Sequence, residues 1–116
     1  MSTVTTHVLD TALGRPAAGV AVRLERAGDA SAPVAEGVTV AEGVTDANGR
    51  ISDLGPDGLA PGTYRIVFDT GAYFRRDGRR AFYPEVTVTF LIEAGGGHYH
   101  VPLTLSPFAY STYRGS

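Results

Sequence analysis

The chain of 116 residues contains no cysteine, and all ten of its basic residues are arginine. The lack of cysteine excludes disulfides, thiolate nucleophiles and sulfur-ligated metals, so packing and any subunit contacts must hold the fold together. The lack of lysine excludes Schiff-base chemistry on a lysine amine. A net charge of −2 gives no electrostatic basis for binding nucleic acid.

Long hydrophobic runs are also absent. No segment approaches the roughly 20 apolar residues that a membrane helix requires, so no membrane partner is expected. Residues 1–6 have neither the basic stretch nor the apolar run of a secretory signal. We therefore expect a cytoplasmic protein, and the length predicts one domain over residues 1–116.

Apolar and polar residues alternate along most of the chain, which is the pattern of half-buried β-strands. The clearest case is the segment in which every second residue from Val86 to Ile92 is apolar. Turn signals separate these segments, and Asn48-Gly49 suits a hairpin turn that needs positive φ. The pattern predicts an all-β fold, a two-sheet antiparallel sandwich of about eight strands with one short, poorly capped helix near residues 71–76. The predicted strands lie near 4–9, 20–26, 34–45, 50–54, 63–69, 84–92, 98–105 and 110–114.

Two local features need separate explanations. The hexamer at residues 34–39 recurs directly at residues 40–45. A shift of six residues preserves strand facing, so either copy could pair in the sheet while the other lengthens a loop. The segment from Arg75 to Arg80 resembles a phosphate-binding loop, but it has no interleaved aromatic residues and the chain is acidic. A solvated loop is the favoured interpretation.

The histidines are the main candidates for chemistry. His98 and His100 flank Tyr99, so their side chains share one face of a strand while Tyr99 faces the other way. By the same alternation His7 faces outward from its strand, and Arg50 faces outward directly after a predicted turn. Outward polar groups become a buried site only when something covers the sheet, and in a small oligomeric sandwich the cover is another subunit.

Several segments of this chain resemble transthyretin-related proteins. They are Thr6–Ala17 (THVLDTALGRPA), Thr45–Arg50 (TDANGR) and Phe82–Val86 (FYPEV). The segments His98–Leu103 (HYHVPL) and Ser106–Ser116 (SPFAYSTYRGS) are similar to the 5-hydroxyisourate hydrolase branch of that family. The Tyr-Arg-Gly-Ser ending distinguishes this branch from transthyretin, the thyroid-hormone carrier. The doubled hexamer departs from the family pattern, which has one copy.

This resemblance implies a homotetramer, a dimer of dimers, with a purine-derived substrate bound in the channel between dimers. The implied reaction is the hydrolysis of 5-hydroxyisourate to 2-oxo-4-hydroxy-4-carboxy-5-ureidoimidazoline in urate degradation, without a metal or other cofactor. By family position the catalytic residues would be His7, Arg50 and His100. The residues implied to line the substrate site are Ser111, Tyr113, Arg114, Gly115 and Ser116.

The chemistry of this reaction fits the residue types. Water must attack the carbonyl of a cyclic acyl–nitrogen bond, and a neutral imidazole can deprotonate that water near neutral pH. Arg50 offers charged donors to the oxygen that gains negative charge. A second imidazole can return a proton to the leaving nitrogen. Whether His7 or His100 is the base stays open.

Two other functions also stay open. A His-x-His pair is a familiar zinc motif, and His7 could supply a third ligand, which would make the protein a zinc-dependent cyclic amide hydrolase. No acidic residue lies near the pair in sequence to support such ligands. The other alternative is a transthyretin-like small-molecule binding protein without catalysis. A carrier of apolar ligands gains nothing from burying two imidazoles and a guanidinium.

Overall fold

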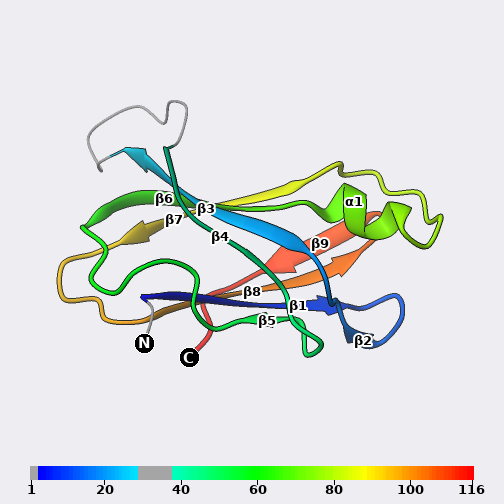
Figure 1. The fold of residues 1–116 in the computed structure, drawn as a ribbon, viewed down its shortest axis with the longest axis horizontal. Helices are drawn as coiled ribbons and strands as arrows, with labels where there is room; N and C mark the ends of the chain where they lie inside the picture. Colours follow the sequence, from blue (N-terminus) through cyan, green and yellow to red (C-terminus); the bar gives the residue numbers. More distant parts are fainter. Residues whose placement is uncertain (1–2, 29–37) are drawn as a thin grey trace.

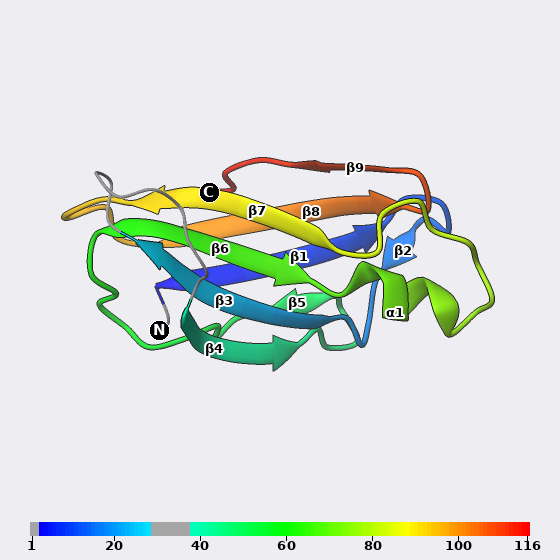
Figure 2. The ribbon, with the colours of Figure 1, turned by 90° about the horizontal axis from the view of Figure 1, so that it is seen from above.

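The computed structural model describes residues 3–28 and 38–116. Two β-sheets pack face to face, and the helix α1 (Thr70–Arg75) lies at one end (Figure 1). One sheet has the order β2-β1-β8-β9 with β5 also paired to β1, and the other has the order β4-β3-β6-β7. Figure 2 shows β9 and β4 at opposite sides of the sandwich. The strands are β1 Val4–Asp10, β2 Arg15–Pro16, β3 Ala21–Gly28, β4 Val38–Val44, β5 Arg50–Ile51, β6 Gly62–Phe68, β7 Val86–Ile92, β8 Tyr99–Ser106 and β9 Ala109–Thr112.

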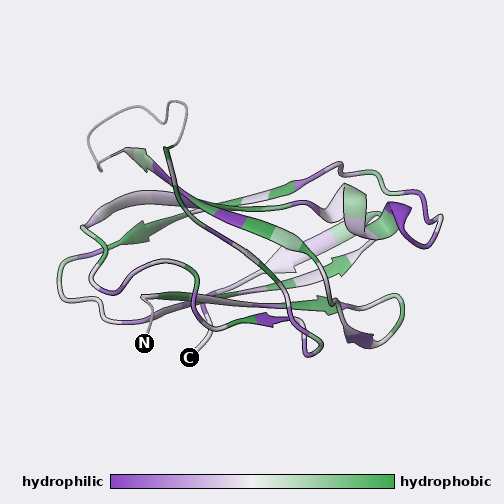
Figure 3. Cartoon of the chain, in the orientation of Figure 1, coloured by the Kyte–Doolittle hydropathy of each residue, from purple (hydrophilic) through white to green (hydrophobic). Residues whose placement is uncertain are grey.

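The alternation in the sequence produces the core between the sheets. In β6, Tyr64, Ile66 and Phe68 are all buried, as are Tyr99 and Leu103 of β8 in the facing sheet. Figure 3 shows hydrophobic segments along the strands of both sheets and strongly hydrophilic residues in the turn after α1. The predicted two-sheet sandwich is therefore confirmed, and its inward faces are the predicted ones.

One strand pair differs from the antiparallel prediction. β1 and β8 run parallel, with Thr5 opposite His100 and His7 opposite Pro102. Alternation indicates which face a side chain occupies, but it carries no information on the direction of the neighbouring strand. The parallel pair places the beginning of β1 beside the histidines that precede and begin β8, so it determines where the candidate site forms.

Smaller differences concern element bounds. Residues 15–16, predicted as part of a turn, form the short strand β2, and the predicted strand at 50–54 is only the two-residue β5. Both copies of the hexamer contribute to β4: the second copy pairs with β3, with Val44 opposite Ala21, and so do Val38 and Thr39, the last two residues of the first copy. Residues 34–37 of the first copy lie outside the described residues.

The helix α1 has a cap that the sequence interpretation missed. The Asp69 side chain accepts a hydrogen bond from the Ala72 amide at 3.3 Å, which satisfies one of the free donors at the start of the helix. The prediction of poor capping was therefore wrong. Within the described part of the chain, no helix has the length and apolar character needed to cross a membrane.

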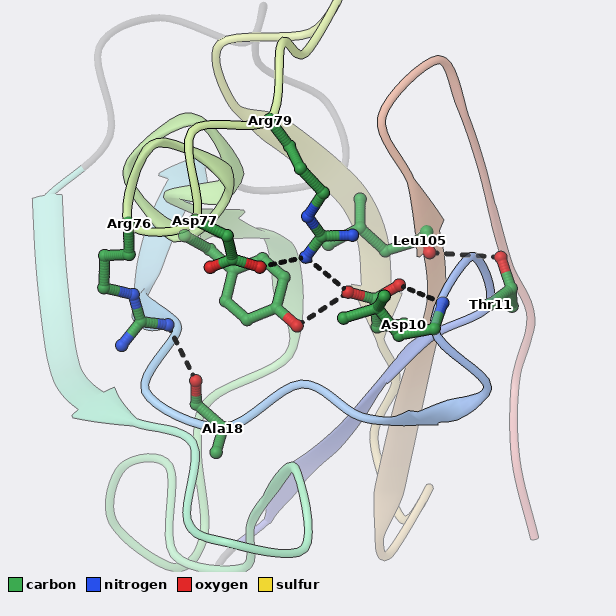
Figure 4. A network of polar contacts seen from close by, with 9 residues as sticks. Asp10, Thr11, Ala18, Arg76, Asp77, Arg79 and Leu105 are labelled. Atoms are coloured by element: carbon green, nitrogen blue, oxygen red, sulfur yellow. Dashed lines mark hydrogen bonds and ion pairs between the residues drawn. The ribbon is translucent and has the colours of Figure 1, made fainter.

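The arginine-rich turn after α1 is not simply solvated, so that prediction was also wrong (Figure 4). Arg79 Nη2 donates to Asp10 Oδ2 at 2.8 Å and lies 2.9 Å from Asp77 Oδ2. The Tyr73 hydroxyl donates to the same Asp10 oxygen at 2.7 Å. Arg76 Nη2 donates to a backbone carbonyl of the loop between β2 and β3 at 2.8 Å. Tertiary partners thus bind two of the four arginines to the sandwich.

Asp10 is fully buried at the end of β1. Burial alone would raise the pKa of its carboxyl group, but hydrogen bonds from Arg79, Tyr73 and the Leu13 amide, together with the charge of Arg79, hold that pKa below its usual value. The charged carboxylate therefore ties β1 to the segment that follows α1.

Candidate active site

A depression of about 220 Å³ lies where β1, β5 and the start of β8 meet. It gathers residues from four separate parts of the sequence. Its lining consists of Thr5, Thr6, Arg50, Ile51, Ser52, His98, His100 and Ser116. The structure therefore brings Arg50 and His100 together with His98, which the sequence placed beside His100 on the same face.

Thr5 holds both of these histidines. Its Oγ1 lies 2.8 Å from Nδ1 of His100 and 2.9 Å from Nε2 of His98. Thr5 is opposite His100 in the parallel β1–β8 pair, so the two side chains emerge on the same face of the sheet. His98 lies just before β8 and is exposed, whereas His100 is half-buried.

His100 has an unusual electrostatic environment. Burial lowers the pKa of His100, and the positive charge of Arg50 lowers it further, as does any charge on His7 or His98, against a smaller opposing contact with the Thr5 backbone. A lowered pKa keeps the imidazole neutral at neutral pH. A neutral imidazole can accept a proton, which is the property that a general base requires.

The turn at residues 46–49 positions Arg50. Asp46 Oδ1 accepts hydrogen bonds from the Asn48 amide at 2.8 Å and from the Arg50 amide at 3.0 Å. Gly49 has φ +75°, and a Cβ there would collide with the carbonyl oxygen of Val8. The turn therefore packs directly on β1, where the Val8 amide donates to the Gly49 carbonyl at 2.7 Å.

The same turn orients His7. His7 is opposite Arg50 in the β1–β5 pair, and its Nε2 lies 2.9 Å from the backbone carbonyl oxygen of Asn48. A carbonyl oxygen only accepts hydrogen bonds, so Nε2 carries the proton and Nδ1 is the nitrogen left for exchange with a ligand. His7 lies beside the depression rather than among its lining residues.

The last residues of the chain lie against the histidine strand. The Gly115 amide donates to the His100 carbonyl at 2.8 Å, and a Cβ on Gly115 would lie 2.5 Å from Cδ2 of the His100 ring. Arg114 Nη2 donates to the His98 carbonyl at 3.4 Å, and its guanidinium lies over the Tyr99 ring at 4.4 Å. Arg114 and Gly115 therefore position the two histidines, while Ser116 reaches the depression itself.

The other two residues of the predicted set lie elsewhere in the protomer. Ser111 is opposite Thr104, with their hydroxyl oxygens 2.5 Å apart. Thr104 is four residues from His100 along β8, which corresponds to about 13 Å. Tyr113 is 59% exposed and lines a separate hollow of about 240 Å³ with Phe90 and other residues. Within one protomer neither residue lines the depression.

The geometry supplies no metal-ligand set in residues 3–28 and 38–116. None of the His, Cys, Asp and Glu side chains there form a group of three that could hold a metal ion. His7 Nε2 is bonded to a carbonyl, and a hydroxyl stands between the other two imidazoles. The zinc alternative therefore finds no support in the arrangement of these side chains.

Sequence reasoning missed two contributors to the site. Asp46 had a readable signal, because an Asp that opens a turn before Asn-Gly commonly accepts hydrogen bonds from amides further along the turn. Thr5 had none, since its partners lie 93 and 95 residues away. Its role emerges only from the pairing of β1 with β8.

The fold and the depression together define a transthyretin-like β-sandwich that carries a histidine–arginine cluster on one sheet. The chain belongs to the HIUase/Transthyretin family, whose sequence profile matches residues 4–115. It is 45% identical over 116 residues to the 5-hydroxyisourate hydrolase of Mus musculus, and the match covers 99% of this chain and 96% of the mouse protein. These findings confirm the family resemblance.

Solved structures agree with this assignment. The structure of Klebsiella pneumoniae 5-hydroxyisourate hydrolase matches with a TM-score of 0.84 at 40% identity, covering 100% of this chain and 94% of that chain. The crystal structure of transthyretin from Sparus aurata matches with a TM-score of 0.88 at 33% identity, covering 99% and 97%. The backbone is thus shared by a hydrolase and a transthyretin, so function must be argued from the side chains of the site.

Proposed function

We propose that this protein is a 5-hydroxyisourate hydrolase of urate degradation, which converts 5-hydroxyisourate to 2-oxo-4-hydroxy-4-carboxy-5-ureidoimidazoline. The observation that carries the proposal is the convergence of Arg50, His98 and His100 in one depression beside His7. The relatives named for this enzyme support it with identities above 40% over nearly the full chain.

In the proposed mechanism His100 is the general base. Its Nδ1 is occupied by Thr5, so Nε2 is the nitrogen that accepts a proton from water as the water oxygen attacks the substrate carbonyl. Arg50 stabilises the negative charge that develops on the carbonyl oxygen. The carbon–nitrogen bond then breaks, and the leaving nitrogen takes a proton from His7, which must carry a second proton on Nδ1 for this step and becomes neutral, with Nε2–H still on the Asn48 carbonyl.

The remaining site residues act in an assembled protein. We place Arg114, Gly115 and Ser116 at the wall of the substrate site, since they contact or adjoin the histidines. Ser111 and Tyr113 are proposed to line the same channel once subunits of a homotetramer, a dimer of dimers, close over this sheet. Neither residue lines the depression within one protomer, so a neighbouring subunit would have to bring them to the channel.

A carrier function is the second candidate, because the transthyretin of Sparus aurata matches with a TM-score of 0.88. A binding protein for apolar ligands would lose free energy by covering two imidazoles and a guanidinium. In a hydrolase the imidazoles transfer protons and the guanidinium stabilises negative charge, so the hydrolase is the stronger candidate.

The test is turnover of freshly generated uricase product, followed by the ultraviolet decay of 5-hydroxyisourate. The wild-type protein should accelerate this decay, and His100→Ala or Arg50→Ala should reduce kcat by about 10²–10³-fold. Arg80→Ala is the matched control, since Arg80 is an exposed arginine after α1 and does not line the depression. A wild-type protein that leaves the spontaneous decay unchanged would favour the carrier, and loss of activity after chelation would restore the zinc mechanism.

A further inference from the structure

The hydroxyl group of Thr5 connects two imidazoles. It lies within hydrogen-bond distance of Nδ1 of His100 and Nε2 of His98, and Thr5 is only 9% exposed. A hydroxyl has one hydrogen, so it donates to one of these nitrogens and accepts from the other. In the neutral state one of the two facing nitrogens carries a proton and the other does not.

This arrangement links the tautomers of the two rings. When Nδ1 of His100 carries a proton, it donates to Thr5, and Thr5 donates to Nε2 of His98. His100 Nε2 is then unprotonated and can act as a base. In the opposite arrangement Nε2 of His98 donates to Thr5, Thr5 donates to Nδ1 of His100, and the neutral His100 carries its proton on Nε2.

We propose that Thr5 is a positioning residue that relays a proton from His100 to His98 during catalysis, a proposal that rests on the hydrolase function argued above. As an O–H bond of water breaks, its proton forms an N–H bond at His100 Nε2. The proton of His100 Nδ1 moves to the Thr5 oxygen, and the original Thr5 hydrogen moves to His98 Nε2. His100 and Thr5 end neutral, and His98 carries the positive charge that balances the negative charge gained by the substrate oxygen.

The surroundings favour this displacement of charge. His100 is half-buried and lines the same depression as Arg50, whose positive charge acts on it, whereas His98 is exposed to solvent. Other charged or titratable groups near the two rings include His7 on β1 and Arg114, whose guanidinium reaches the His98 carbonyl. Asp46 interacts electrostatically with Arg50 and His7 and offsets part of their positive charge. A proton on solvated His98 therefore costs less than one held at His100.

Kinetics of Thr5 variants test the relay. Thr5→Val keeps the side-chain shape without the hydroxyl, and we expect kcat to fall by about 10–10²-fold with KM within about threefold. Thr5→Ser keeps the hydroxyl and should stay within about threefold of wild type. Thr87→Val, on an exposed position of β7 in the other sheet, is the matched control. Near-normal kcat in folded Thr5→Val, or equal losses in the Val and Ser variants, would overturn the proposal.

A double-mutant cycle with His98→Gln gives a second readout, because Gln can exchange hydrogen bonds but cannot accept a proton. If Thr5 and His98 act as one unit, the double variant should lose no more activity than the more damaged single variant. Losses that multiply would contradict the relay.

Histidine ¹⁵N NMR separates this inference from the proposed function. In wild-type protein His98 and His100 should titrate as a strongly coupled pair, and in Thr5→Val the coupling should weaken to the electrostatic part that acts directly between the rings. Independent titration in the wild type would overturn the relay even in an active enzyme. A protein with coupled titration but no hydroxyisourate turnover would retain the hydrogen-bonded link and refute the proposed substrate.

Discussion

His100 is held between a hydroxyl on one side and a glycine on the other. Thr5 fixes Nδ1 at 2.8 Å, while Gly115 approaches the opposite edge of the ring closely enough that a Cβ would lie 2.5 Å from Cδ2. Single residues therefore fix the ring plane of the proposed base from both sides. Catalysis depends on such placement because a small displacement of a reacting group strongly lowers the reaction rate.

Gly115→Ala tests this close approach. The added methyl group must displace the His100 ring or break the hydrogen bond from the residue 115 amide to the His100 carbonyl. We expect kcat for hydroxyisourate to fall by about 10-fold or more. The thermal midpoint should change little, since the substituted residue lies outside the core. Steady-state kinetics with a thermal melt measures both, and an unaltered kcat would show that His100 tolerates a shifted position.

At the scale of elements, the turn at residues 46–49 positions two residues of the candidate site. It sets the register in which His7 faces Arg50, and it supplies the carbonyl that orients the His7 ring. The helix α1 and the turn after it have a similar positioning role at the other end of β1, where Tyr73 of the helix and Arg79 of the turn bind the buried Asp10.

The ion pair of Asp10 predicts a pH-dependent stability. The pKa of Asp10 in the folded protein lies below the unfolded value near 3.8, so its contribution is present above that pH and is lost as the pH falls through the folded pKa. Arg79→Ala should lower the free energy of unfolding by about 3 kcal/mol at pH 7, because it leaves a buried carboxylate without its cation. The difference from wild type should shrink at pH 3.

Urea denaturation at the two pH values measures this effect. Arg80→Ala should stay within about 0.5 kcal/mol of wild type at both, since Arg80 is exposed. An Arg79→Ala difference that is equally large at pH 3 would assign the loss to packing over Phe74 and Tyr73 rather than to the charge of Asp10.

The sequence predicted which face of a strand a side chain occupies, but it did not predict which strands and side chains lie next to each other. Alternation located the inward residues Val86 and Ile92 of β7 and placed His98 with His100, because facing follows from the local geometry of a strand. It could not show that β1 and β8 are parallel neighbours, nor that Arg79 would find Asp10 across 69 residues. The family resemblance supplied the candidate catalytic set. The role of Thr5 could not be predicted, because tertiary structure alone brings it to His98 and His100.

For the whole molecule, the main feature is a site on one sheet together with large aromatic residues exposed toward the other end of β8, around the β8–β9 turn. Phe82 and Phe108 are 69% and 66% exposed, and Tyr83 stacks edge-on against both Phe82 and Tyr110. The four residues of β9 are all exposed. Exposed apolar surface of this kind is commonly covered by subunit contacts.

Assembly is therefore a testable property. Light scattering after size-exclusion chromatography should give a mass four times the 12.2 kDa of one chain. Phe108→Ser should lower the assembled fraction and the turnover together, because the proposed channel needs neighbouring subunits. A fully active protein that is monomeric at micromolar concentration would show that one protomer suffices.

The pairing of β1 with β8 also affects the order in which parts of the protein can fold during synthesis. Thr5 meets His100 only after 95 further residues have been made, and contacts of such long range are slow to close. A nascent polypeptide can assemble the β3-β6-β7 layer while its opening strand still lacks a partner. The candidate active site should therefore form late in synthesis and in one step, once β8 has left the ribosome and can pair with β1.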